Sequence, residues 1–132
     1  MPIIPVFNIQ TQLEFEQKAL QVFKFQHKHL DIYKTYCDLL KVNPHKVLKI
    51  SDIPFLPITF FKQQPILANN CVAEKIFTSS GTTSNTTSKH YVADLTLYKT
   101  SFTTAFKQQY GPIEDYTILA LLPSYLESDS SS

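Results

Sequence analysis

The chain has 132 residues and a formal net charge of +1, and 43% of its residues are hydrophobic against 17% charged. This composition predicts one globular domain, because enough apolar surface is available to form a core. The positive residues are lysines scattered along the chain, without the arginine that favours bidentate contacts with bases and phosphates, so we expect no nucleic-acid partner.

No stretch approaches the ~20 apolar residues of a membrane span, and the first residues do not read as a secretory signal. We therefore expect a cytoplasmic protein without a membrane span. Cys37 and Cys71 are too far apart in sequence for a metal or redox motif, and we expect buried structural thiols. His27 and His29 are two residues apart on a predicted helix and face different directions, so no metal site is expected.

The first half of the chain predicts helices. Apolar residues at helical spacing predict one helix over residues 11–30 and a second over residues 32–40, which we expect to pack together as a core. Asn43-Pro44 is expected to end the second helix, because a residue before proline avoids the helical region. After this helical front of residues 1–50, Pro57 is expected to start one helical turn over residues 58–62.

The second half alternates strands and a helix. We expect strands at residues 74–78 and 89–93, separated by a loop, and then a helix that begins at an Asp94 N-cap and stops at Gly111-Pro112. The apolar run Thr117–Leu122 predicts a further strand, buried on both faces. A helix between strands indicates an α/β fold.

The loop between the first two strands reads Thr78-Ser79-Ser80-Gly81-Thr82-Thr83-Ser84. Gly81 lacks a Cβ, so its backbone can turn and approach a ligand closely, and successive N–H groups in such a turn can bind an anion. Lys89 adds a positive charge. A solvated polar connection remains the alternative. The run fits neither a P-loop nor a dinucleotide fingerprint, both of which require more glycines.

The order Ser-Ser-Gly-Thr-Thr-Ser resembles the phosphate loop of the adenylate-forming superfamily. Three flanking blocks are similar to its acyl-protein synthetase branch, which includes the synthetase of bacterial luminescence systems and acyltransferase-like bacterial proteins. The chain departs from the superfamily pattern in two ways: Ser84 replaces a second glycine, and Asn85–Ser88 precedes Lys89 without a proline. The resemblance covers roughly residues 50–127, and the flanking blocks are Ile53–Lys62, Ser88–Val92 and Leu121–Glu127.

The resemblance implies an ATP-dependent acyl-activating ligase. Such an enzyme joins a fatty or other carboxylate to ATP, with Mg²⁺, and passes the acyl group to a thiol. It implies no catalytic residue within residues 1–132, because the catalytic lysine of the complete enzyme would lie beyond residue 132. The residues that it implies for ATP phosphate binding are Ser79, Ser80, Gly81, Thr82, Thr83, Ser84 and Lys89.

Because adenylate-forming enzymes are longer, we expect residues 1–132 to be a single partial domain, the amino-terminal part of a larger adenylation domain. Its fold would run from amino-terminal helices to strand–phosphate loop–strand–helix–strand, with residues 51–127 as the family-like α/β segment. We expect this piece to be inactive alone and to self-associate through uncovered apolar surface. The acyl chain and the final acceptor stay undetermined.

Two other functions remain open from the residues alone. One is a non-enzymatic α/β binding or assembly module in which the Ser/Thr-rich loop is structural. The other is a hydrolase built from Ser79 or Ser80 with His90 and Asp94, although the Gly-x-Ser-x-Gly turn of α/β-hydrolases is absent.

Overall fold

The computed structural model of the chain describes residues 6–78 and 88–119. The chain divides into two compact units. The first comprises Met1–Phe60 with Ile66–Cys71, and the second comprises Phe61–Pro65 with Val72–Ser132.

The first unit begins with α1, Gln12–His29, whose start is fixed by a capping box. The Thr11 hydroxyl accepts the Glu14 N–H at 3.2 Å, and the Glu14 carboxylate accepts the N–H groups of Gln10 at 2.8 Å and Thr11 at 3.0 Å. These backbone donors favour the charged carboxylate and lower the pKa of Glu14. The helix predicted over residues 11–30 is thereby confirmed to within one residue at each end.

The second helix, α2, spans Asp31–Leu39 and ends before the predicted stop at Asn43-Pro44. Lys41 adopts a left-handed backbone with φ 56°, and the Val42 N–H donates to the Cys37 carbonyl at 3.0 Å. This left-handed residue reverses the chain and satisfies a helix-terminal carbonyl. Asn43 instead begins the short 3₁₀ helix η1, Pro44–Lys46, by accepting the His45 N–H at 2.9 Å.

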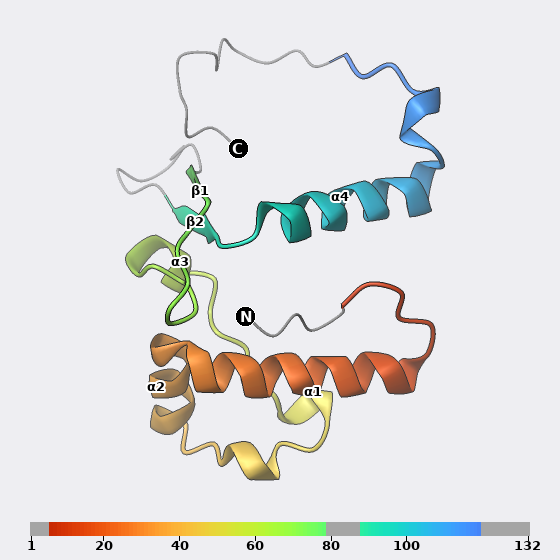
Figure 1. Cartoon of the computed structure of the whole chain (residues 1–132). Coiled ribbons are helices and arrows are strands. Elements are labelled where there is room, and N and C mark those ends of the chain that lie inside the picture. Colours follow the sequence, from red (N-terminus) through yellow and green to blue (C-terminus); the bar gives the residue numbers. More distant parts are fainter. Residues whose placement is uncertain (1–5, 79–87, 120–132) are drawn as a thin grey trace. The chain divides into compact units, whose positions relative to one another are not determined.

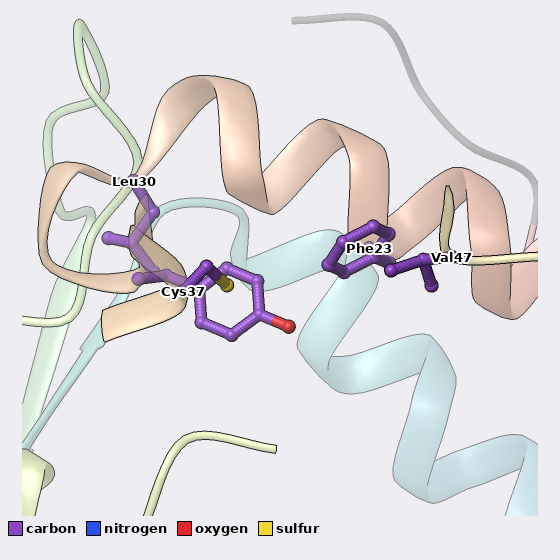
Figure 2. Close-up of a cluster of buried hydrophobic side chains, with 5 residues drawn as sticks. Phe23, Leu30, Cys37 and Val47 are labelled. Carbon is purple, nitrogen blue, oxygen red and sulfur yellow. The ribbon is translucent and has the colours of Figure 1, made fainter. Parts of the chain in front are cut away.

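The core of the first unit lies where α1 and α2 meet the segment after η1 (Figure 2). Phe23 and Cys37 are the most deeply buried, with 2% and 0% of their surface exposed. The Tyr33 hydroxyl donates to the Pro54 carbonyl at 2.6 Å and so links α2 to the chain beyond η2, Ile50–Asp52. The prediction that the two helices pack as a core is confirmed; its buried residues are Phe23, Leu30, Tyr33, Cys37 and Val47.

A short helix, α3, spans Phe60–Gln63, where the chain passes from one unit to the other. Its first N–H, on Phe60, donates to the Pro57 carbonyl at 3.1 Å. The predicted turn over residues 58–62 is therefore present, but its helical part begins two residues later than expected.

The second unit contains β1, Lys75–Thr78, and β2, Lys89–Val92, which pair antiparallel and lead into α4, Leu95–Tyr110 (Figure 1). Gly111 ends α4 with φ 91°, a backbone angle that favours glycine, and η3, Ile113–Asp115, follows. Both predicted strands and the helix stop are confirmed. The predicted loop over residues 79–87 lies outside the described residues.

The prediction of a strand at Thr117–Leu122 is wrong for residues 117–119, the part of this range that the structure describes. Residues 117–119 have no regular secondary structure, and Ile118 and Leu119 are 67% and 90% exposed. A strand buried on both faces needs neighbouring strands and covering layers. The sheet formed by the described residues has two strands only. Over these residues the fold is mixed helical with a small antiparallel sheet, consistent with the α/β class.

Candidate functional site: the β1–β2 hairpin

Six of the seven predicted phosphate-binding residues, Ser79–Ser84, lie outside the described residues. The seventh, Lys89, is the first residue of β2, and its side chain is exposed. The described part of the candidate site is therefore the hairpin that carries the loop and the helix that follows it. No helix within the described ranges combines the length and the apolarity needed to cross a bilayer.

The ladder register holds the two ends of the loop opposite one another. Because Thr78 pairs with Lys89, the chain that leaves β1 returns to β2 at the facing position. Directly opposite residues in an antiparallel pair lie about 4.5–5.5 Å apart between Cα atoms. The hairpin thus fixes where the loop begins and ends. Its four pairs are Lys75 with Val92, Ile76 with Tyr91, Phe77 with His90 and Thr78 with Lys89.

The hairpin has two different faces, because opposite residues share a face and successive residues alternate. On one face, the Phe77 ring lies 5.2 Å from the Tyr98 ring of α4, measured between centroids. We call this the helix face; it comprises Lys75, Phe77, His90 and Val92. The other face carries Lys89, and we call it the loop face; it comprises Ile76, Thr78, Lys89 and Tyr91.

His90 and Asp94 have structural partners in this unit. The His90 ring lies edge-on to Phe61 and to Tyr98, with both centroid separations 6.2 Å. The Asp94 carboxylate accepts the Leu97 N–H at 2.8 Å, which confirms it as the N-cap of α4. The His90 side chain stays exposed beside these two rings, whereas Asp94 caps α4. The serines of the hydrolase alternative lie outside the described residues.

A second carboxylate at the start of α4 was not anticipated from the sequence. The Glu74 Oε2 atom accepts the Leu95 N–H at 2.9 Å, and the Glu74 N–H donates to the Val92 carbonyl at 2.8 Å. Nothing local in the sequence signals this contact, since Glu74 and Leu95 are 21 residues apart. With Asp94, two negative charges complement the positive end of the helix dipole, which disfavours a phosphate there.

The two cysteines differ in their surroundings. Cys37 is fully buried, and burial raises the pKa of its thiol. The prediction of a buried structural thiol is confirmed for Cys37, while Cys71 is only partly buried. A buried thiol that keeps its proton is a poor nucleophile, so Cys37 does not have the environment of an acyl acceptor.

Residues 6–78 and 88–119 contain no group of three or more His, Cys, Asp or Glu side chains arranged to hold a metal ion.

Comparison with known proteins identifies a family and a relative of this chain. The family described as "Acyl-protein synthetase, LuxE" matches residues 6–121. A protein of Photorhabdus luminescens named "Long-chain-fatty-acid--luciferin-component ligase" is 33% identical over 82 residues, which cover 61% of this chain and 69% of that protein. No solved structure matches. The family match begins at residue 6, so it also includes most of the helical front, which precedes the resemblance noted over residues 50–127.

Proposed function

This chain belongs to the LuxE family of acyl-protein synthetases, and from that membership we propose that it takes part in ATP-dependent activation of a fatty acid. In this reaction a carboxylate oxygen attacks the α-phosphorus of ATP, the bond to the β-phosphate breaks, and acyl-adenylate and pyrophosphate result. A thiolate then attacks the acyl carbon, and AMP leaves as the thioester forms. The family match over residues 6–121 is the observation that carries the proposal.

The Ser/Thr-rich loop is the proposed ATP-binding element. Ser79, Ser80, Gly81 and the following Thr82–Ser84 would donate hydroxyl and backbone hydrogen bonds to the β- and γ-phosphates. The pairing of Thr78 with Lys89 supports this role, because it places both ends of the loop at facing positions of one ladder. Groups held in place before the ligand arrives stabilise phosphate charge without a cost of reorganisation.

Lys89 is the proposed counter-charge to the phosphates. It is exposed on the loop face, next to the point where the loop returns, and away from the packed rings of the helix face. The start of α4 is already occupied by the carboxylates of Glu74 and Asp94. Phosphate binding near the hairpin would therefore depend on the loop N–H groups and on Lys89.

The remaining participants follow from the same proposal. Mg²⁺ would enter with ATP, bound through its phosphate oxygens, and would neutralise their charge. The acyl acceptor would be a thiol other than Cys37, because that thiol is fully buried. A reaction that consumes ATP is consistent with a cytoplasmic location.

The proposal predicts that Lys89→Gln weakens ATP binding about tenfold, measured by calorimetric titration of the purified protein, which corresponds to ~1.4 kcal/mol. Lys99→Gln on α4 is the matched control, because it removes the same charge from another exposed site of the second unit; we expect less than a twofold effect.

Gly81→Ala should also lower the affinity for ATP about tenfold in the same titration, since a Cβ would crowd the phosphates.

Two results would contradict the proposal. The unmodified protein failing to bind ATP would remove the nucleotide from the function and would favour the non-enzymatic module. Equal losses in Lys89→Gln and Lys99→Gln would show a general effect of charge rather than a site at the loop.

A further inference from the structure

We propose that Glu74 is a positioning residue for the phosphate loop. Its carboxylate ties the base of the β1–β2 hairpin to the first turn of α4, and this tie sets where the far end of the hairpin, with Thr78 and Lys89, is held. The inference rests on the proposed function, because it assigns a role in orienting the same loop for nucleotide.

The connection between hairpin and helix shows why such a tie matters. On the β2 side the chain runs directly through Ala93 and Asp94 into α4, so this link is covalent. β1 has no such direct covalent link to α4, and Glu74, the residue before β1, supplies a link instead. Its carboxylate accepts the Leu95 N–H at 2.9 Å while its own N–H extends the ladder to the Val92 carbonyl at 2.8 Å.

A third contact supports the same orientation. The rings of Phe77 and Tyr98 are 5.2 Å apart between centroids with an interplanar angle of 31°, on the helix face of the hairpin. Ring stacking permits sliding, whereas a hydrogen bond to a charged acceptor is stronger and directional. Without the Glu74 carboxylate, the hairpin would keep the ring contacts of Phe77 and His90 with Tyr98 but could rotate about Ala93 and Asp94.

The expected displacement is large compared with what a binding site tolerates. A strand of four residues is about 13 Å long, so a rotation of ~10° at the base moves its far end by about 2 Å. Functional groups must be held to within about 0.5 Å of their productive positions. Loss of the tie should therefore weaken nucleotide binding, although Glu74 lies at the opposite end of β1 from the loop.

The experiment compares Glu74→Ala with Glu14→Ala. Both variants remove a carboxylate that accepts N–H groups at the start of a helix, but Glu14 belongs to α1 in the first unit. We expect both to lower the melting temperature and only Glu74→Ala to weaken ATP binding, by about tenfold. Amide exchange of Leu95 should accelerate in Glu74→Ala and stay unchanged in Glu14→Ala. Glu74→Gln, which keeps the acceptor oxygen, should restore affinity to within about threefold of the unmodified protein.

The outcomes separate this inference from the proposed function. If the unmodified protein does not bind ATP, both are overturned. If it binds ATP and Glu74→Ala binds equally well, only the positioning role is overturned. The same holds if Glu14→Ala loses as much affinity, since the effect would then be general destabilisation. Failure of Glu74→Gln to restore affinity would also overturn it, because the hydrogen bond would not be the cause.

Discussion

At the scale of single residues, Tyr33 illustrates how one side chain joins distant parts of the first unit. It is 4% exposed, its ring meets Phe23 of α1 edge-on at 6.2 Å between centroids, and its hydroxyl donates to the Pro54 carbonyl. Burial, followed by the nearby Cys37, raises the pKa of Tyr33 well above its usual range. The neutral phenol is the form that this core accommodates.

The raised pKa values of Tyr33 and Cys37 predict a loss of stability at alkaline pH. The unfolded chain releases these protons near the ordinary values of 10.0 and 9.0, while the folded chain still holds them. The contribution of these two groups to the free energy of unfolding is therefore fully present below about pH 9. It is lost as the pH rises toward their pKa values in the folded chain, by up to ~1.4 kcal/mol per pH unit for each group. Denaturant unfolding between pH 7 and pH 11 measures this loss.

The variant Tyr33→Phe tests whether Tyr33 contributes to this loss of stability at alkaline pH. We expect it to cost about 1 kcal/mol at pH 7, because the Pro54 carbonyl loses its donor, and to flatten the alkaline decline. Tyr36→Phe on the same helix is the control, since its ring contacts Phe60 at 6.0 Å and should keep that contact. An alkaline decline that is as steep in Tyr33→Phe as in the unmodified protein would contradict the interpretation.

At the scale of elements, the longer helices begin at side chains that the sequence makes recognisable. Thr11 and Asp94 are residues with short oxygen-bearing side chains directly before helical patterns, and each accepts an N–H of the first turn. The end of α4 at Gly111 was also predicted from the sequence. The end of α2 was not, because a left-handed lysine, Lys41, stops it before the proline does.

The α1 capping box predicts that Thr11→Ala lowers the free energy of unfolding by about 1 kcal/mol. Thr35→Ala, at an exposed position inside α2, is the matched control; alanine is the better helix former there, so we expect no loss. Urea unfolding followed by circular dichroism measures both. Equal effects of the two substitutions would show that the cap contributes nothing specific.

At the scale of the whole molecule, the two units are stabilised differently. Among the described residues, five of the six buried apolar side chains belong to the first unit, and Val92 alone belongs to the second. The second unit packs largely through ring contacts along α4, where Phe102 and Tyr110 remain 52% and 58% exposed. Local stability follows buried apolar contact, so the first unit should open less often.

Hydrogen exchange on the whole chain tests this difference. We expect amides in the middle of α1 and α2 to be protected at least tenfold more than those in the middle of α4. Nuclear magnetic resonance or mass spectrometry can resolve the three helices in one sample. Exchange in α4 as slow as in α1 would contradict the prediction, because the second unit would then be held as firmly as the first.

The sequence by itself determined the features that depend on neighbours along the chain. Helical spacing gave α1 and α2, turn and cap residues gave the limits of α4, and the run of hydroxyl residues around Gly81 predicted the loop and led to the acyl-protein synthetase family. The phosphate-binding roles of Ser79–Ser84 and Lys89 stay predictions. The helices and their limits can be predicted from the sequence, because capping and amphipathic patterning act over three or four residues.

Only the tertiary structure decided the contacts between distant positions. It showed Glu74 on the first turn of α4, Tyr33 on Pro54, and Thr78 opposite Lys89, and it showed that the apolar residues Ile118 and Leu119 are exposed rather than in a strand. A strand needs partners that can come from anywhere in the chain, and a side-chain hydrogen bond between residues 21 apart leaves no periodic pattern in the sequence. Such contacts depend on how whole elements pack, so the orientation of the candidate site could not be derived from local patterns.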